Sequence, residues 1–442
     1  MGTTQLKYTP NSTSTRYKAT ISAWVKRTNI GAEGWIFEGK NGTSQADGFR
    51  FQANNTINML LNDGGGGSCT TNRLFRDNNA FYHLMWVVDT TQATASDRMK
   101  LYVNGVQETS FSSASYPAQN FAIEGTFANG QDMYIGTQHG YNYFEGVMSH
   151  YHICDGYAYQ PSDFGSTDAV TGEWKINTSP SVSYGTHGTF ILKDGNSVTD
   201  QSGNSNNWSV HGGTLTKTED CPSNVFATFN PLIANTGANF LNGNNNCHRT
   251  SAGNYRRIGC TLGATSGKYY AEFLLGASQW GGVCLTNGGD IARTEAGSNG
   301  YMGEYSADKS VGVRQDGIVY SHGANVSSAQ WNLGTISTSS DRLCLALDMD
   351  NKKLFLGKNG TWSSSSNPAS NTGGITLTGD SYTFCVATSN ADCIINTGNG
   401  NFANGTTANL ISSEGTNASG IGKFEYDVPT GYTALSTKGL NL

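Results

Sequence analysis

Residues 146–175, GVMSHYHICDGYAYQPSDFGSTDAVTGEWK, divide this chain into two folded parts. Up to Cys154 the pattern is typical of a closing β-strand. The chain then passes through a short polar turn, Gln160–Asp163, and a glycine-rich segment around Gly172. Strand-like segments lie before this stretch, and a linker followed by more strand-like segments lies after it. We therefore expect two β-units joined here.

The composition favours short strands over helices. Charged residues make up only 14% of the chain and 56 residues are glycine, which suits strands joined by tight turns. With 21 Tyr, 19 Phe and 8 Trp, the chain has too much buriable apolar surface for a disordered protein. A length of 442 residues accommodates two or three domains. The expected fold class is all-β and multi-domain.

Charge and hydropathy exclude several classes of partner. The net charge is −6 and no run of Lys and Arg occurs, so we expect no nucleic acid to bind. No stretch approaches the roughly 18 apolar residues of a membrane helix, so we expect no membrane insertion. The N-terminal residues MGTTQLKYTPNSTS lack the apolar core of a signal peptide, which predicts synthesis in a cytoplasm.

The nine cysteines are irregularly spaced and form no CxxC pair. Structural zinc is therefore not expected, and no cofactor is predicted. Cys284 and Cys344 lie in apolar strand patterns, where a thiol behaves as a small buried hydrophobe. Cys385 and Cys393 flank a turn near Ser389, and whether they pair as a disulfide stays open.

The first unit, residues 1–158, shows the period of two that is typical of strands. Residues 18–26 alternate, with apolar Ala19, Ile21, Ala23 and Val25 on one face, which predicts a half-buried strand. Residues 100–103 meet Asn104-Gly105, a strong signal for a tight hairpin because both residues tolerate positive φ.

The phrases YHLMWVVDTT, MKLYVNGVQE and YIGTQHGYNYFEGVMSHYHI together resemble the laminin-G-like, concanavalin-type jelly roll. The resemblance covers most of residues 18–158 and implies a β-sandwich for the first unit. Ser149 and His150 stand where that family has an acidic pair, so the resemblance gives little support for an inherited calcium site.

The second unit, residues 231–442, begins with the alternating stretch KYYAEFLL at 268–275, and Asp316-Gly317 predicts a two-residue hairpin turn. The phrase RLCLALDMDNKKLFLGKNGTW resembles a hairpin of the SPRY module, which implies a second β-sandwich that binds ligands through its loops. Residues 348–351 begin like a calcium loop, but Lys352 occupies a ligand position, so a turn is predicted instead.

Residues 159–230 are polar and turn-rich, and we expect an ordered connector between the two sandwiches. Its expected apolar anchors are Phe190, Leu192, Trp208, Phe226 and Phe229. Its phrases QPSDFGSTDAVTGEWKI, DQSGNSNNWSV and FATFNPL resemble a recurring connector in virion proteins of tailed, particularly marine, bacteriophages. That resemblance implies a location in the virion, after synthesis in the host cytoplasm.

Catalytic and metal-binding patterns are weak. Concanavalin-type glycosidases carry paired carboxylates as E-x-D-x-x-E, and this chain has no such triple; Glu304 and Asp308 have the wrong spacing. No catalytic residue and no enzymatic activity is therefore predicted. His150 and His152 are two apart and would share a face of a strand, with His139 as a third candidate, but no metal site is predicted.

Aromatic residues that we expect to be exposed in loops give the more useful signal. Sugar C–H faces stack on flat rings while hydroxyl groups need fixed polar partners. Two sets fit this chemistry as candidate glycan-binding residues: Tyr141, Asn142 and Tyr143 in the first unit, and Trp280, Tyr301 and Tyr305 in the second.

These observations predict a non-enzymatic virion structural protein: a capsid decoration, fibre or tail-associated protein. Its expected partners are other virion proteins, in the capsid or tail, with host-surface glycans as further ligands. A homo-oligomer is expected, a trimer by analogy, because virion appendages must match symmetric sites. The alternative hypothesis is a free-standing carbohydrate-binding or adhesion protein, and a polysaccharide-degrading enzyme is less favoured.

Overall fold

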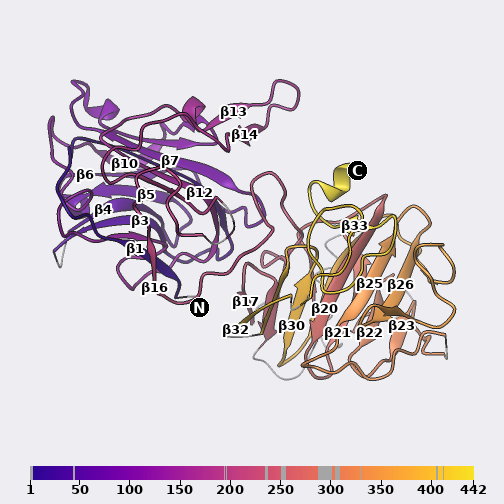
Figure 1. Cartoon of the computed structure of the whole chain (residues 1–442). Helices are drawn as coiled ribbons and strands as arrows, with labels where there is room; N and C mark the ends of the chain where they lie inside the picture. The colour runs from indigo at the N-terminus through magenta and orange to yellow at the C-terminus, as the bar shows by residue number, and fades with distance from the viewer. Residues whose placement is uncertain are drawn as a thin grey trace. The chain divides into compact units, whose positions relative to one another are not determined.

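In the computed structural model the chain forms two compact units (Figure 1). Unit 1 comprises Met1–Lys217 with Cys221–Ser223, and unit 2 comprises Thr218–Asp220 with Asn224–Leu442. The structure describes residues 3–442 except 43–44, 194, 196, 234–236, 250–254, 287–300, 304–308, 329, 405–406 and 412.

The secondary structure of the described residues is β throughout, which confirms the expected fold class. The helical turns are four short 3₁₀ segments: η1 (Asn62–Gly64), η2 (Ala95–Asp97), η3 (Pro161–Asp163) and η4 (Gly439–Asn441). None of the helices within the described part of the chain is long and apolar enough to cross a membrane.

Unit 1 is a sandwich of two large sheets. An eight-stranded sheet has the order β10-β6-β5-β4-β3-β11-β1-β16 and faces a six-stranded sheet of order β15-β12-β2-β7-β8-β9, while β13 and β14 form a separate hairpin. The strands of the larger sheet are β1 (Gln5–Tyr8), β3 (Gly34–Asn41), β4 (Gln45–Phe51), β5 (Ile57–Leu61), β6 (Gly67–Thr71), β10 (Phe111–Ser115), β11 (Met133–Ile135) and β16 (Ser209–Gly212). The other strands are β2 (Lys18–Arg27), β7 (Tyr82–Asp89), β8 (Met99–Val103), β9 (Val106–Gln107), β12 (Gly146–Asp155), β13 (Gly165–Thr167), β14 (Trp174–Ile176) and β15 (Thr189–Ile191).

The core of unit 1 lies between its two large sheets. Trp86 of β7 packs its ring 6.4 Å from that of Phe37 and 5.9 Å from that of Phe49, which come from the opposite sheet. The predicted apolar face of β2, including Ile21 and Val25, joins the same cluster. Asn104 and Gly105 form the tight turn between β8 and β9, with φ of 49° and 80°, as their sequence predicts.

The outer face of β2 is also buried, so the expectation of a half-buried strand is wrong. The segment after β12 lies over this face of the six-stranded sheet: Phe164 and Tyr184 pack with Met85 and Val87 of β7. The alternation of polar and apolar residues in β2 cannot show this covering, because the residues that provide it lie more than a hundred positions away.

The segment expected to be a connector contributes strands to unit 1. Strand β15 pairs with β12, and β16 pairs with β1, so each large sheet gains an edge strand from residues 189–212. Leu192 and Trp208 belong to the core cluster of unit 1. Phe226 and Phe229 instead lie in buried clusters of unit 2.

Unit 2 is a second sandwich. Its larger sheet runs β17-β18-β30-β20-β25-β26-β27, with β28 on β26 and β33 parallel to β20; its second sheet runs β19-β29-β21-β22-β23-β24. The first sheet contains β17 (Ala238–Leu241), β18 (Asn246–Arg249), β20 (Lys268–Leu275), β25 (Leu343–Asp348), β26 (Lys353–Lys358), β27 (Thr361–Trp362), β28 (Ile375–Thr376), β30 (Asp392–Asn396) and β33 (Thr433–Ala434). The others are β19 (Arg256–Gly259), β21 (Trp280–Leu285), β22 (Val311–Arg314), β23 (Val319–Ser321), β24 (Ala324–Asn325), β29 (Tyr382–Thr388) and the hairpin β31 (Asn401–Asn404) with β32 (Thr407–Leu410).

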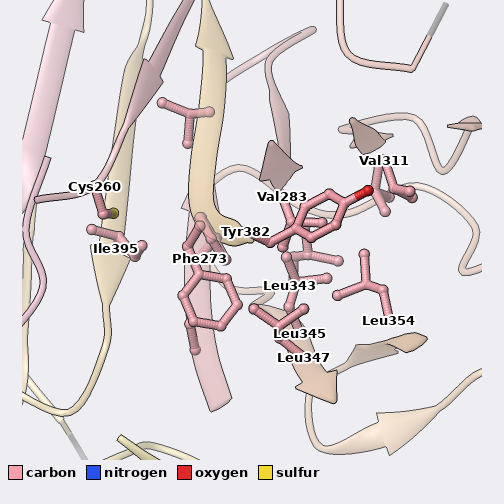
Figure 2. Close-up of a cluster of buried hydrophobic side chains, with 14 of the residues drawn as sticks. Cys260, Phe273, Val283, Val311, Leu343, Leu345, Leu347, Leu354, Tyr382 and Ile395 are labelled. Carbon is pink, nitrogen blue, oxygen red and sulfur yellow. The ribbon is translucent and has the colours of Figure 1, made fainter. Parts of the chain in front are cut away.

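Figure 2 shows part of the core between these two sheets, with Phe273, Leu343 and Leu345 beside Val283 and Tyr382. The expected faces of β20 and β25 are confirmed, because Tyr269, Phe273 and Leu347 all belong to this cluster. The Asp316-Gly317 turn is one residue longer than predicted: Gln315 is part of it, since the amide of Arg314 bonds the carbonyl of Ile318.

The C-terminal segment covers the outer face of the larger sheet of unit 2. Phe424 and Tyr432 pack there with Tyr270 and Phe355. The buried carboxylate of Glu272 on β20 holds the segment, accepting the backbone N–H of Tyr426 at 2.8 Å. It also accepts the N–H of Glu425 at 2.9 Å. Burial raises the pKa of Glu272 to about 7.

The cysteine strands do not pair as the sequence suggested. Cys385 of β29 lies opposite Gly259 and Gly282, whereas Cys393 of β30 lies opposite Cys247 of β18. The two cysteines belong to different sheets and are not bonded, which answers the question that the sequence left open. All nine cysteines are free thiols, and only Cys221 is not buried.

Candidate binding loop of unit 1

Residues 136–143, between β11 and β12, form a strained loop that carries the candidate residues of unit 1. His139 and Asn142 adopt φ of 35° and 48°, a region that costs free energy for residues with a Cβ atom. Gly136 and Gly140 have φ of 82° and 102°, where glycine is readily accommodated. Strained loops of this kind persist only where surrounding contacts hold them.

Hydrogen bonds within the loop supply those contacts. Gln138 and Tyr141 exchange two backbone hydrogen bonds of 2.8 Å each. The hydroxyl of Thr137 donates to the carbonyl of Tyr141 at 2.9 Å and accepts the N–H of Gly140 at 3.0 Å. As a result the backbone at Tyr141 is fixed, while its side chain remains 67% exposed.

The buried carboxyl group of Glu38 holds the side chain of His139. Nδ1 of His139 donates to Oε1 of Glu38 at 2.8 Å, because a carboxylate oxygen can only accept. The side chain of Glu38 is 0% exposed, and its Oε2 has no hydrogen-bond partner. Burial raises the pKa of Glu38 above its ordinary value, and the bond to His139 opposes that rise. The ring of Tyr141 meets the His139 ring edge-on, at 5.9 Å and 82°.

Glu33 anchors the other side of the loop. Its Oε1 accepts Nδ2 of Asn142 at 3.1 Å, Nε1 of Trp35 at 3.0 Å and Nη1 of Arg50 at 3.0 Å. The Arg50 guanidinium also lies 4.9 Å above the Trp35 ring. Trp35 donates its backbone N–H to the carbonyl of Asn142 at 3.1 Å. The loop therefore presents Asn142 to solvent with its amide already oriented.

Tyr143 differs from its two neighbours in the loop. It is partly buried and lines a hollow of about 10 Å³ together with Phe51 and Glu145. That volume is about the room one water molecule needs, so the hollow itself is too small for a sugar. Of the three candidates in unit 1, the structure exposes Tyr141 and Asn142.

The candidates of unit 2 are placed differently. Trp280 of β21 is 1% exposed, so its expected exposure is wrong. Its ring lies 5.7 Å from that of Tyr301 and 5.6 Å from that of Tyr320, on the outer face of the smaller sheet, with Arg314 across it at 5.7 Å. Tyr301 is partly buried in the same cluster. Tyr305 lies outside the described residues, as do Glu304 and Asp308.

The three candidate metal-binding histidines have other partners. His139 bonds Glu38, and Nδ1 of His152 lies 2.9 Å from the hydroxyl of Tyr184. A β-bulge between Ser149 and His152 breaks the alternation of β12, and His150 has a φ of 46°. The expectation that His150 and His152 share a regular strand face therefore fails. Within the described ranges no group of three or more His, Cys, Asp or Glu residues is placed to hold a metal ion.

Sequence reasoning missed the residues that support the loop. Glu33, Glu38 and Arg50 lie some hundred positions before Tyr141, and no local pattern marks them. The pairing of β11 with β3 brings Glu38 to the loop, since Tyr134 lies opposite Glu38 in that ladder, and the pairing of β3 with β4 places Arg50 opposite Trp35. Only a long-range pairing of strands would have revealed them.

Residues 1–162 match a laminin-G-type family model described as the concanavalin A-like lectin/glucanases superfamily. This match confirms the expected laminin-G-like, concanavalin-type fold of the first unit. The description covers both lectins and glucanases, so it does not by itself decide between binding and hydrolysis. No curated protein matches the chain.

Solved structures are similar only in fold. The SPRY domain of human HERC1 is 18% identical, with a TM-score of 0.28, covering 38% of this chain and 96% of that domain. A heptameric SAP-like pentraxin from Limulus polyphemus is 15% identical, with a TM-score of 0.30, covering 44% and 87%. A putative carbohydrate-binding protein from Bacteroides ovatus is 14% identical, with a TM-score of 0.31, covering 49% and 60%.

Proposed function

We propose that this chain is a non-enzymatic carbohydrate-binding and adhesion protein, with the binding loop of unit 1 as a glycan site. The exposed ring of Tyr141 on a backbone fixed by hydrogen bonds carries the proposal. Glu33 orients the amide of Asn142 beside it, so one flat apolar surface and one fixed polar group face the same ligand. Nδ2 of Asn142 donates to Glu33 and to Gln138, which leaves Oδ1 as the acceptor for a ligand. This pairing suits a sugar, whose C–H face stacks on the ring while a hydroxyl group donates to that oxygen.

The sequence supports binding over hydrolysis because it lacks the E-x-D-x-x-E triple of concanavalin-type glycosidases. The matched family description, which includes lectins, is consistent with a binding role. In the finer form of this proposal the protein is a virion component that docks to other virion proteins as a homo-oligomer. The support for that form is the ordered set of connector phrases between residues 160 and 232.

The binding proposal is tested on a glycan array with the full chain, comparing wild type with Tyr141→Ala. A matched control is Tyr17→Ala, since Tyr17 is also an exposed tyrosine of unit 1, at 39%. An aromatic stacking contact contributes about 0.5–1.5 kcal/mol, which predicts roughly threefold to tenfold weaker binding for Tyr141→Ala alone. Equal binding by both variants, or no retained glycan, would contradict the proposed site. Release of new reducing ends from a bound glycan would show hydrolysis instead.

The virion form has a separate test. Mass spectrometry of purified particles is expected to find the chain at a fixed ratio to the capsid subunit, and cryo-electron microscopy to place it on the shell or the tail. Absence from particles that otherwise contain their structural proteins would rule out the virion role and leave the binding role standing.

A further inference from the structure

A second recess lies in unit 2, far in sequence from the binding loop. Three neighbouring strands of the larger sheet build it: β18, β30 and β20. Their register pairs His248 with Asp392, and Ile394 with Leu274. Side chains alternate between the two faces of a sheet, so these four share the face opposite the core, to which Cys247, Cys393 and Phe273 belong.

The recess has a volume of about 350 Å³, within the range of pockets that hold small ligands. Leu274 and Ile394 form an apolar floor and are themselves 6% and 1% exposed. Asn390 and Thr338 come from loops and line the recess together with His248 and Asp392. Because the floor and the His248–Asp392 pair sit on strands, their positions are held by the sheet.

The polar groups of the recess retain hydrogen-bonding capacity for a ligand. Nδ1 of His248 donates to Oδ1 of Asp392 at 2.9 Å, which leaves Nε2 of the ring and Oδ2 of the carboxylate. The two side chains are 37% and 33% exposed, so a ligand can replace water at both. No Lys or Arg is among the described residues that line the recess, and an anionic ligand would therefore meet a carboxylate without a counter-charge.

We infer that this recess binds one neutral sugar ring, with its C–H face against the apolar lining residues Leu274, Ala277 and Ala391 and its hydroxyl groups on Asp392, His248 and Asn390. A polyol matches groups of both kinds, because each hydroxyl donates and accepts. The inference takes its ligand class from the proposed function but concerns a different unit. Failure of one site therefore does not imply failure of the other.

The test is saturation-transfer NMR of the full chain with methyl hexosides and N-acetylhexosamines at up to millimolar concentration. Ala277 is exposed at the rim, so Ala277→Phe fills the recess without disturbing the core. Its matched control is Ala324→Phe, at an exposed alanine of the edge strand β24. Asp392→Asn removes the charge and keeps the shape, with Asp380→Asn, at a 97% exposed carboxylate, as its control.

We expect Tyr141→Ala to leave binding at this recess in place, Ala277→Phe to abolish it, and Asp392→Asn to weaken it about tenfold, since a hydrogen bond to a charged group is lost. The two controls should bind as wild type. The recess variants and their controls are made in the Tyr141→Ala chain, so that sugar held at the loop of unit 1 does not contribute to the signal. Binding that survives both Ala277→Phe and Asp392→Asn in that chain would overturn the inference, as would the absence of any binding to the Tyr141→Ala chain itself. Preferential binding of an alkylammonium probe over every neutral sugar would also overturn it.

Discussion

Replacement of His83 by Asn should remove a steep acid sensitivity from unit 1. His83 is fully buried on β7, its ring stacked between Trp24 at 5.0 Å and Trp174 at 5.9 Å. The indole N–H of Trp174 donates to Nδ1 at 3.0 Å, so Nε2 carries the ring proton and donates to Ser22 Oγ at 2.8 Å. A second proton on Nδ1 would face the donor of Trp174 at a fully buried side chain. Burial accordingly lowers the pKa of His83 to about 3.

The sign and size of the effect follow from linkage. The unfolded chain has a His pKa of about 6.5, so as pH falls below that value the unfolded state gains a proton that the folded state does not accept. The free energy of unfolding should then fall by about 1.4 kcal/mol per pH unit, until both states are protonated below about pH 3. Between pH 6.5 and pH 5 the loss from His83 is about 2 kcal/mol.

The assay is urea unfolding at several pH values, read by pulsed hydrogen exchange of peptides from β2 and β7 so that unit 1 is followed separately. Asn keeps an acceptor for Trp174 but loses the ring packing of His83, so His83→Asn is expected to be less stable at pH 7. Because Asn does not titrate, the difference in free energy of unfolding between wild type and His83→Asn should shrink by about 2 kcal/mol from pH 7 to pH 5. Tyr141→Ala, which leaves the surroundings of His83 unchanged, should keep the wild-type slope. Parallel pH profiles for wild type and His83→Asn would refute the reasoning.

The remaining predictions concern the buried carboxyl group of Glu272 in unit 2 and the cysteine thiols. Glu272→Ala leaves the backbone N–H groups of Glu425 and Tyr426 without their acceptor, so unit 2 should lose about 2–5 kcal/mol in urea unfolding; a loss below about 0.5 kcal/mol would contradict its role in holding the C-terminal segment. Because the folded pKa of Glu272, about 7, exceeds its unfolded value of about 4.3, its proton-linked stabilisation is full below pH 4 and lost as pH rises through 7. The protection factors of residues 415–434, which correct for the faster intrinsic exchange at higher pH, should therefore fall over that range in wild type but not in Glu272→Ala. Native protein should react with one equivalent of a thiol reagent, at Cys221, and Cys221→Ser should abolish this reaction; rapid labelling of any other cysteine would contradict the buried positions.

The sequence pattern correctly predicts strands whose inner face packs against a core. It does not predict which outer faces are buried, because the segments that bury them are distant in the sequence. Residues 18–26 and 268–275 form strands with the expected inner faces, and Asn104-Gly105 forms its tight turn, because these depend on local alternation and backbone preference. Whether the outer face of a strand is buried depends on segments that are distant in the sequence and pack over it. Trp280 was placed on the surface for the same reason: its sequence neighbours do not reveal Tyr320 and Arg314, which cover it.

The candidate sites were predictable to an unequal degree. Tyr141 and Asn142 stand in a loop rich in Gly and aromatic residues, so their exposure could be inferred. The carboxylates that orient them could not, since Glu33 and Glu38 reach the loop only through the pairing of β3 with β11. The recess of unit 2 is likewise a product of strand register, since His248 and Asp392 are 144 positions apart.

The way each unit covers its own sheet limits where a ligand can bind. In unit 1 the segment with Phe164 and Tyr184 buries the outer face of the six-stranded sheet, and in unit 2 the segment with Phe424 and Tyr432 buries much of that of the larger sheet. A broad exposed sheet face would otherwise be an apolar surface suited to protein partners or to aggregation. With those faces filled by the chain itself, compact ligands are left with loops between strands and with uncovered edges. The candidate loop at Tyr141 is such a loop, and the recess at Asp392 lies on a part of the outer sheet face formed by β18, β30 and β20. Both are small and lined by polar groups, which agrees with the proposal of compact polar ligands for them.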